Sequence, residues 1–141
     1  MGNAILEKDT SITFPHFTLL KASAGSGKTY SLTERFVQFL LSDKIPQNHL
    51  RNILAITFSN NATKEMKERI FSWLKDIYFN DPEKTDKLSQ IVSLRKEDLP
   101  VRAEATIHDI LRNYTEFQVK TIDSFMTSIY KASAINLGYS P

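Results

Sequence analysis

Apolar positions along the chain fall alternately into short runs and into stretches of helical spacing. Three runs have the length of a strand: residues 17–21, 53–57 and 117–122. Four longer stretches repeat apolar residues every three or four positions, as helices do: residues 28–42, 62–79, 101–114 and 123–138. A continuous apolar run such as Ile53 to Ile56 is typical of a parallel strand that helices cover on both faces. The pattern predicts an α/β fold with a parallel sheet.

The helical spacing also predicts which side chains face the core. On the first helix these are Leu32, Phe36, Phe39 and Leu40. On the second they are Met66, Ile70, Trp73, Leu74 and Ile77. On the third we expect Ala105, Ile107, Ile110 and Leu111, and on the last Phe125, Ile129, Ala132 and Ile135. Asp123 is the expected cap of that last helix.

The chain is expected to form one domain with a tail and an insertion. Residues 1–15 are polar and predict a flexible N-terminal tail, and residues 16–141 follow as the domain. Residues 80–115 predict a helical insertion. Its first part, residues 80–100, is charged, carries a short apolar pattern from Leu88 to Leu94, and is expected on the surface.

Parallel strands joined by helices place their carboxyl ends, and usually the ligand, at one edge of the sheet. The segments Ala22–Gly27, Thr57–Asn61 and Thr121–Ser124 each follow a predicted strand. All three are therefore expected along this edge, which is where functional loops gather in such folds.

The first of these segments has the composition of a phosphate-binding loop. Residues 22–29 read A-S-A-G-S-G-K-T, with Ala22 where the usual pattern has Gly. Backbone N–H groups of such a loop and the following helix N-terminus bind phosphate oxygens, Lys28 would reach the β and γ phosphates, and Thr29 would ligate Mg²⁺. The predicted ATP-binding residues are Ala22, Ser23, Ala24, Gly25, Ser26, Gly27, Lys28, Thr29 and Tyr30. The alternative is a merely flexible turn after a strand.

Composition narrows the class of protein only modestly. The 141 residues carry a formal net charge of +2 and no cysteine. Near-neutral charge neither supports nor excludes a DNA partner. No apolar run approaches the roughly 20 residues of a membrane span, and the polar residues 1–13 lack the apolar segment of a signal peptide. We therefore expect a soluble, cytoplasmic protein without a membrane partner.

Three segments together resemble the UvrD/RecB-type helicases of superfamily one. Besides the phosphate loop, residues 53–70 read I-L-A-I-T-F-S-N-N-A-T-K-E-M-K-E-R-I and resemble motif Ia, and residues 119–125 read V-K-T-I-D-S-F and resemble motif Ib. The phosphate loop is most similar to the RecB and AddA-like branch, which serves double-strand break repair with an associated exonuclease. The resemblance implies part of a first RecA-like domain, with the three-layer P-loop NTPase fold, that uses ATP and Mg²⁺ and binds single-stranded DNA.

In this family motifs Ia and Ib lie along the track of single-stranded DNA. The resemblance thereby implies these DNA-binding residues: Thr57, Phe58, Ser59, Asn60, Asn61, Thr121, Asp123 and Ser124. Two of them depart from the family, because Asn61 replaces a common Lys and Asp123 a common His. Phe58 could offer a ring for base stacking, or it could pack in the core, as Phe125 could. Asp123 could instead act only as a helix cap.

Hydrolysis of ATP needs an acidic residue for Mg²⁺ and water, and an arginine for the developing charge. Neither is identifiable, since the run from Val119 to Asp123 is interrupted by Lys120 and Thr121. We expect an N-terminal fragment of a longer helicase, in which Lys28 is the catalytic lysine and turnover by the fragment alone is very low. Its expected partners are the remaining helicase domains and a nuclease or helicase subunit.

Two other functions remain open from the residues alone. In a small P-loop kinase, Asp123 or Glu65 would act in phosphoryl transfer and residues 80–98 would form a lid, although only Arg95 and Arg102 could serve it. A binding module would hold nucleotide or single-stranded DNA without catalysis. Among the other basic residues, Lys64, Lys67, Arg69 and Lys75 are expected on a solvated helix face, with an ion pair between Lys64 and Glu68.

Overall fold

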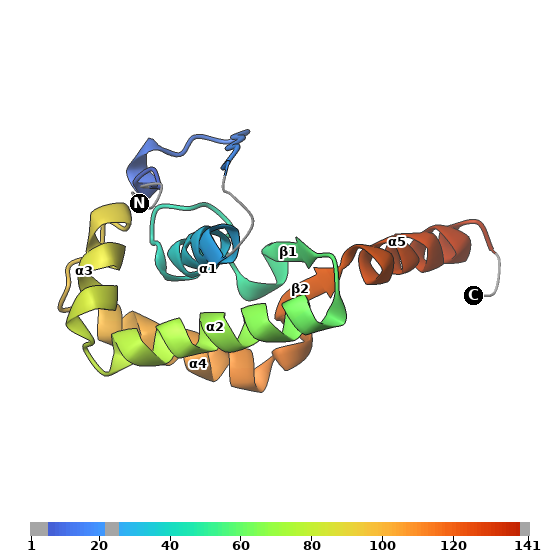
Figure 1. The fold of residues 1–141 in the computed structure, drawn as a ribbon. Coiled ribbons are helices and arrows are strands. Elements are labelled where there is room, and N and C mark those ends of the chain that lie inside the picture. The colour runs from blue at the N-terminus through green and yellow to red at the C-terminus, as the bar shows by residue number, and fades with distance from the viewer. Residues whose placement is uncertain (1–5, 22–25, 139–141) are drawn as a thin grey trace.

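The computed structural model describes residues 6–21 and 26–138, in which helices and strands follow one another much as the pattern predicts (Figure 1). The helices are α1 (Ser26–Leu41), α2 (Asn60–Tyr78), α3 (Pro82–Ile91), α4 (Leu99–Arg112) and α5 (Ile122–Asn136). The strands are β1 (Leu54–Thr57) and β2 (Gln118–Thr121). Short 3-10 turns lie at Asp9–Ser11, Leu50–Asn52 and Tyr114–Glu116. None of the described helices is both long and apolar enough to cross a bilayer.

Strands β1 and β2 pair in parallel, which confirms the prediction that these two segments belong to a parallel sheet. Their register places Leu54 opposite Gln118 and Thr57 opposite Thr121. Parallel neighbours need a long crossover, and here helices α2, α3 and α4 make it. Both strands therefore end at the same edge of the sheet.

The described part of the sheet has helices on one face only. Ala55 and its partner Val119 are buried beneath α2, whereas Leu54 and Ile56 on the other face are 39% and 40% exposed. The prediction that helices cover both faces of this strand is wrong for the described residues. An unbroken apolar run in the sequence does not show whether the second face of the strand is covered by a helix of the same domain or is exposed.

The strand predicted at residues 17–21 does not form. These residues have no strand partner, and Phe17 and Leu19 are 86% and 70% exposed. A strand exists only where its backbone pairs with a neighbour, and the described sheet contains β1 and β2 alone. The apolar composition of residues 17–21 indicated a strand, but composition does not show whether a neighbouring strand is present to pair with it.

The core lies around the apolar face of α2. The side chains predicted for this face are all buried: Met66, Ile70, Trp73, Leu74 and Ile77. Helix α4 packs along α2, while α1, with buried Val37 and Leu41, packs against another part of it (Figure 1). Of the residues predicted for α1, Phe36 and Leu40 are buried, but Leu32 is 42% exposed.

Helix α4 buries only part of the predicted face, namely Ile110 and, in part, Ile107. Leu99, Ala103 and Ile110 are buried, whereas Ala105 is exposed and Leu111 is 63% exposed. The helix begins at Leu99, earlier than expected. Leu99 thus joins the helix two residues before the predicted start at Val101, and together with Ala103 it extends the buried side toward the N-terminus.

The segment expected as a surface insertion contributes to the core. Helix α3 has exposed charged residues on one side, but Leu88, Ile91 and Val92 are almost completely buried. A short helix can bury its apolar side only against neighbouring elements. Here these neighbours are α1 and α2.

Residues 6–12 are packed against the domain and do not form the expected flexible tail. Leu6 and Ile12 are buried, and Asp9 is 1% exposed. The Asp9 carboxylate accepts hydrogen bonds from the Ser42 hydroxyl at 2.6 Å, the Ser93 hydroxyl at 2.5 Å and the Ser93 N–H at 3.1 Å. One buried carboxylate thus connects the N-terminal segment to the end of α1 and to the chain after α3.

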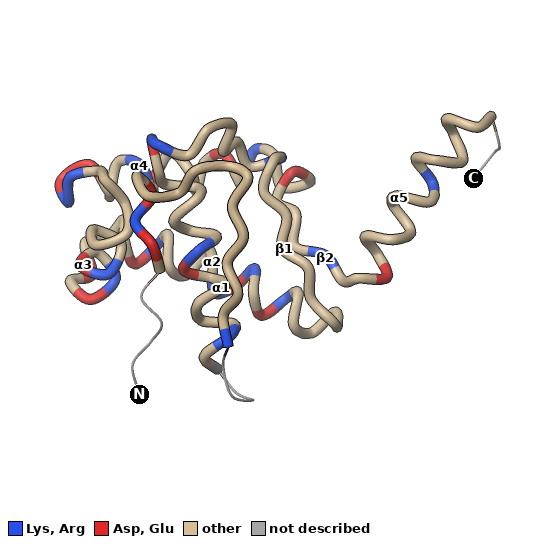
Figure 2. Tube along the Cα trace, turned by 90° about the horizontal axis from the view of Figure 1, so that it is seen from above, with Lys and Arg blue, Asp and Glu red and all other residues tan. Residues whose placement is uncertain are grey.

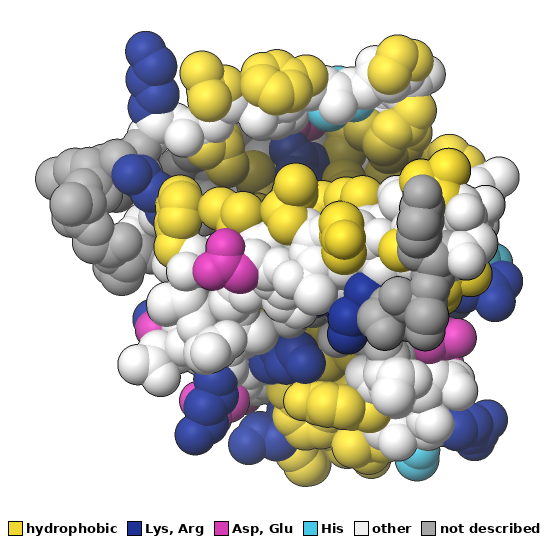
Figure 3. Space-filling model, turned by 90° about the vertical axis from the view of Figure 1, so that its right-hand side faces the viewer, with side chains coloured by type: hydrophobic (Ala, Val, Ile, Leu, Met, Phe, Trp, Pro, Cys, Tyr) yellow, Lys and Arg dark blue, Asp and Glu magenta, His cyan; other side chains and the backbone are white. Residues whose placement is uncertain are grey.

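Helix α5 extends away from the other helices (Figures 1 and 2) and contains no buried residue. Its only charged residues are Asp123 and Lys131. Seen from the side on which it projects, hydrophobic side chains gather across the face of the molecule (Figure 3). The exposed apolar side chains of α5 are Ile122, Met126, Ile129, Tyr130 and Ile135. The apolar face predicted for this helix is therefore uncovered within the described residues.

Among the described residues, three helices begin with a side-chain cap. Ser59 accepts the N–H of Ala62 at the start of α2, and Asp81 accepts that of Lys84 at the start of α3. At α5 the cap is Thr121, which accepts the N–H of Ser124. The prediction that Asp123 caps this helix is wrong, because α5 begins at Ile122 and Asp123 already lies in its first turn.

Asp9→Asn is expected to lower the free energy of unfolding by about 1–3 kcal/mol at neutral pH, because an amide nitrogen would face a hydroxyl or N–H donor. Burial opposes ionisation, but hydrogen bonds from Ser42 and Ser93 outweigh it and hold the pKa of Asp9 below its ordinary 3.8. The stabilisation is therefore present above pH 3.8 and is lost as the pH falls through the lower folded-state pKa. Urea unfolding from about pH 7 to about pH 3 measures both effects.

The matched control is Asp43→Asn, since Asp43 is exposed and pairs only with its neighbour Lys44 at 3.5 Å. We expect almost no change in its unfolding free energy. Equal destabilisation in the two variants, or a deficit in Asp9→Asn that persists at low pH, would contradict the role assigned to Asp9.

Ser59→Ala is expected to lower the free energy of unfolding by about 1 kcal/mol, because the Ala62 N–H at the start of α2 loses its acceptor. Asp98→Ala is the control. Asp98 precedes α4 but makes no capping hydrogen bond, and its pair with Arg95 is exposed. Thermal unfolding should show the larger loss for Ser59→Ala, and the opposite order would refute the capping argument.

Candidate functional site

The carboxyl ends of β1 and β2 bring two predicted polar segments together. We call residues Thr57–Asn61 and Thr121–Ser124 the strand-end rim. Thr57 and Thr121 are direct partners in the parallel register, so the two segments leave the sheet side by side. The sequence-based expectation that they share one edge is confirmed.

The Thr57 hydroxyl lies at the centre of the first rim segment. It is 2.6 Å from the Thr63 hydroxyl and donates to the Ser59 carbonyl at 3.2 Å. Thr63 was not among the predicted site residues, although it lies one turn into α2 and has the same hydroxyl chemistry. These contacts fix the bend of the chain between β1 and α2.

The rim leaves several polar and aromatic side chains accessible. Phe58 is 93% exposed, so its alternative interpretation as a core residue is wrong. Asn60 and Asn61 are exposed, and no described residue forms a hydrogen bond with their side-chain amides. On the second segment Asp123 and Ser124 are exposed as well, while Phe125 is half-buried. The rim can therefore offer a stacking ring, amides and a carboxylate to a ligand.

The phosphate-loop motif is described only in part. Ala22, Ser23, Ala24 and Gly25 lie outside the described residues. Helix α1 begins at Ser26, so Gly27, Lys28 and Thr29 lie in its first turn. Lys28 is exposed, and the Thr29 carbonyl accepts a hydrogen bond from the Thr33 hydroxyl at 2.8 Å. The first turn thus presents an exposed ammonium group beside a threonine.

Nothing in the described chain joins this turn directly to the strand-end rim. No hydrogen bond or ion pair between described residues connects Lys28 or Thr29 with it. Across the described ranges, no group of three or more His, Cys, Asp or Glu side chains is arranged to hold a metal ion. The ligands that suit a metal ion at this turn are a hydroxyl group of the chain and the phosphate oxygens of a bound nucleotide.

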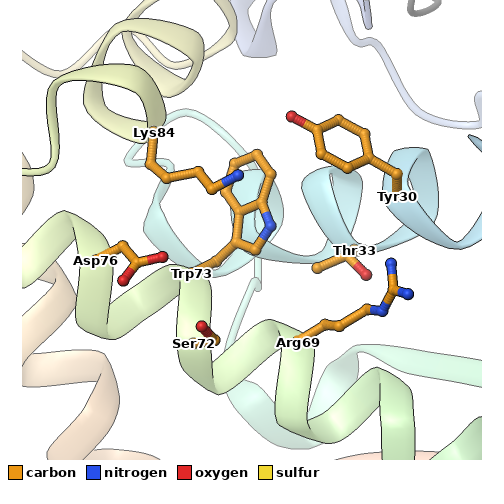
Figure 4. A pocket seen from close by; sticks show the side chains of 7 residues that line it. All are labelled: Tyr30, Thr33, Arg69, Ser72, Trp73, Asp76 and Lys84. Carbon is orange, nitrogen blue, oxygen red and sulfur yellow. The ribbon is translucent and has the colours of Figure 1, made fainter. Parts of the chain in front are cut away.

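Tyr30, the last of the predicted nucleotide residues, faces a cavity between α1, α2 and α3 (Figure 4). The cavity measures about 270 Å³ and is lined by Tyr30, Thr33, Arg69, Ser72, Trp73, Asp76 and Lys84. The Tyr30 ring meets Trp73 edge-on at 5.5 Å, and the Lys84 ammonium lies 4.4 Å from the Trp73 ring centre. Sequence reasoning missed Trp73 as a neighbour of Tyr30, because it appeared only as a core position.

A groove runs along another flank of α2 from the rim. We call it the α2 groove; it measures about 370 Å³ and is lined by Asn60, Thr63, Lys64, Lys67, Glu68 and Tyr114. The Lys67 ammonium lies 4.8 Å from the centre of the Tyr114 ring, which is a cation–π contact. Asn60 belongs to both the groove and the rim, so the two surfaces are continuous.

The charges beside this groove differ from the predicted arrangement. The expected ion pair between Lys64 and Glu68 does not form; Arg69 instead pairs with Glu65 at 2.6 Å. Lys64, Lys67 and Lys75 form no ion pair with any described residue. These three lysines share one flank of α2 with a single carboxylate among the described residues, that of Glu68, and the excess of positive charge favours an anionic ligand there.

The lid that a small kinase would need is contradicted by the packing of residues 80–98. Leu88 and Ile91 in this segment are 0% and 2% exposed, so closure would uncover the core. Of the two arginines, Arg95 bonds Asp98 at 3.0 Å and Arg102 donates to the Leu41 carbonyl at 3.2 Å. Neither the segment nor its arginines is free for the role.

Comparisons with known proteins agree with the motif order. Residues 7–140 match the model of the UvrD/REP helicase N-terminal domain. The chain is also similar to curated proteins named as subunits of an ATP-dependent helicase/nuclease. It is 33% identical over 114 residues to that of Staphylococcus carnosus, which is 79% of this chain and 9% of the relative.

Relatives in two other organisms have the same name. The protein of Clostridioides difficile is 37% identical over 90 residues, which is 64% of this chain and 7% of the relative. That of Alkaliphilus metalliredigens is 38% identical over 111 residues, covering 74% of this chain and 8% of the relative. The chain thus spans less than a tenth of each of these relatives, and no solved structure matches it significantly. Because the family model covers nearly the whole chain, this protein belongs to the UvrD/REP helicase N-terminal domain family.

Proposed function

We propose that this chain is the ATP-binding part of the first RecA-like domain of an ATP-dependent DNA helicase that acts in DNA recombination and repair. The observation that carries the proposal is the start of α1 at Ser26, within the phosphate-loop motif. A helix N-terminus presents free N–H groups and a positive dipole end to phosphates. Membership of the helicase family and the similarity to helicase/nuclease subunits support the same function.

The residues of this first turn suit magnesium-bound ATP. Residues 22–27 would surround the phosphates with backbone N–H groups, and the exposed Lys28 would neutralise the β and γ phosphates. The Thr29 hydroxyl would be a Mg²⁺ ligand, and Tyr30 would complete the nucleotide-binding segment. When bound, Mg²⁺ shields phosphate charge and so lowers the barrier to attack on the γ phosphate.

The strand-end rim is the proposed site for single-stranded DNA. Phe58 offers a ring to which any base can stack, and the rim hydroxyls and amides can bond phosphate or sugar oxygens. Ser59 and Thr121 already accept N–H bonds as caps, so in DNA binding their hydroxyl hydrogens would act as donors. The α2 groove, with Lys64 and Lys67, would attract the next phosphates by charge alone.

We further propose that other helicase domains of a longer chain cover the exposed apolar surfaces. Leu54 and Ile56 on the open face of the sheet and the side chains of α5 form an apolar surface that water solvates poorly. The similarity to helicase/nuclease subunits supports an associated nuclease activity or partner protein in that longer assembly.

Lys28→Ala is expected to weaken binding of Mg²⁺-ATP at least about tenfold, because loss of a charged partner of phosphate costs roughly 1.5–3 kcal/mol. Its fold should be unchanged, since Lys28 is exposed and has no ion pair within the described residues. Titration of the purified chain with a fluorescent ATP analogue gives the affinity. The control is Lys44→Ala, which lies beyond the opposite end of α1.

We expect ATP turnover by this chain to be very low with or without single-stranded DNA, because the sequence shows no apolar strand that ends in an acidic residue for Mg²⁺ and water, and no identifiable catalytic arginine. Unchanged nucleotide affinity in Lys28→Ala would refute the phosphate-loop assignment. DNA-stimulated turnover that Lys28→Ala abolishes would instead mean that the chain supplies the missing groups itself.

Phe58→Ala is expected to weaken binding to a short single-stranded oligonucleotide by about 1–3 kcal/mol, since one stacking ring is lost. The melting temperature should not change, because the Phe58 side chain is 93% exposed. Phe79→Ala is the matched control, as Phe79 is 70% exposed just beyond the other end of α2. Fluorescence anisotropy at fixed salt concentration compares the variants, and equal affinities would exclude Phe58 from the DNA site.

A further inference from the structure

Helix α3 reaches the first turns of α1 through one strong hydrogen bond. The Lys87 ammonium donates to the Tyr30 hydroxyl at 2.6 Å and to Glu83, one turn earlier on α3, at 2.9 Å. Tyr30 directly follows Thr29 in the sequence. A side chain from the helical insertion is thereby attached to the turn that carries Lys28 and Thr29.

The Tyr30 ring is held from more than one direction. Its centre is 5.5 Å from that of the Trp73 ring on α2, with 65° between their planes. The Lys87 and Lys84 ammonium groups lie 5.0 Å and 5.5 Å from the Tyr30 ring centre. Lys84 lies at the same time over Trp73 (Figure 4). Two lysines of α3 and an indole of α2 thus enclose the tyrosine.

The hydrogen bonds of this cluster favour the charged form of Lys87. Hydrogen bonds to Tyr30 and Glu83 raise the pKa of Lys87 to about 12, so the ammonium donor persists at neutral pH. One turn after Tyr30, burial raises the pKa of Glu34, while the positive charges of Lys87 and Lys84 act in the opposite direction. Both lysines therefore also stabilise a carboxylate within α1.

We propose that Lys87 is a positioning residue for the nucleotide-binding end of α1: it holds Tyr30 between α2 and α3 and so sets the orientation of Lys28 and Thr29. The inference rests on the proposed ATP site. A side chain that binds phosphate must be placed within a fraction of an ångström, and small displacements caused by remote groups reduce binding and catalysis. Helix α3 thus acts on the nucleotide site without touching the nucleotide.

The first test measures the affinity for a fluorescent ATP analogue with Mg²⁺. Lys87→Met keeps the stem of the side chain but loses the donor, and we expect affinity to fall about three- to tenfold. Tyr30→Phe removes the acceptor and should have a similar effect, and the double variant should be no weaker than either single variant. Lys87→Arg keeps charge and donor and should restore most of the affinity.

The matched control is Lys96→Met. Lys96 follows α3 and pairs with Asp86 at 2.6 Å, but it does not contact Tyr30. Its removal should leave nucleotide affinity unchanged. Normal affinity in Lys87→Met, or additive effects of Lys87→Met and Tyr30→Phe, would overturn the inference, because either result separates Lys87 from Tyr30.

The second test needs no nucleotide. Hydrogen exchange at the backbone amides of residues 30–34 reports how firmly the start of α1 is held. Exchange there should accelerate in Lys87→Met and not in Lys96→Met, with circular dichroism confirming that both variants are folded. Unchanged exchange at these amides in Lys87→Met would refute the positioning role. Failure of the unmodified chain to bind ATP would count against the proposed function and leaves this second test valid.

Discussion

The buried face of α2 is the constraint on which the rest of the structure depends. Helices α1, α3 and α4 and both strands pack against this helix. Its five buried side chains include Ile70, Leu74 and Ile77, which are completely inaccessible. At about 2 kcal/mol for each large apolar side chain, this face contributes on the order of 10 kcal/mol before entropy is counted, comparable to the net stability of a whole domain. Individual surface ion pairs contribute far less, so packing on α2 decides the fold.

That packing also determines where the candidate sites lie. Because Ala55 and Val119 both pack against α2, the two strands are held in one register and their ends meet. The helix then carries the α2 groove on one flank and the cavity lined by Trp73 and Tyr30 on another. The surface proposed to bind DNA and the contact of Trp73 with Tyr30, which is proposed to orient the ATP site, thus lie on two sides of the same helix.

Local patterns in the sequence predicted the elements whose causes are local. The spacing of Met66, Ile70 and Leu74 was sufficient for α2, and the motif order was sufficient for the family. The strand at residues 17–21 was predicted wrongly, because pairing depends on a neighbour that composition cannot reveal. On α4, Ile107 and Ile110 face the core as predicted, whereas Leu99 was left out of the buried face because it precedes the predicted start of the helix.

In the candidate site, too, local features were predictable from the sequence and contacts between distant residues were not. The meeting of Thr57 and Thr121 followed from strand polarity alone, and the hydroxyl and aromatic character of the rim could be read directly. The contact between Tyr30 and Lys87 joins residues far apart in the sequence, and no spacing rule predicts it. Asp123 has the chemistry of a cap, yet Thr121 is the cap, because the helix begins at Ile122, two residues before the start that a cap at Asp123 would give.

Helix α2 contains neither glycine nor proline from Asn60 to Tyr78, so its 19 residues have no natural hinge. A helix of this length measures about 28 Å and moves as a stiff rod. Its first residues form part of the rim, and Trp73 lies in its second half against Tyr30. A tilt of α2 at the rim would therefore also displace Trp73 in the second half of the helix. The rigid helix thus couples the rim mechanically to the contact between Trp73 and Tyr30.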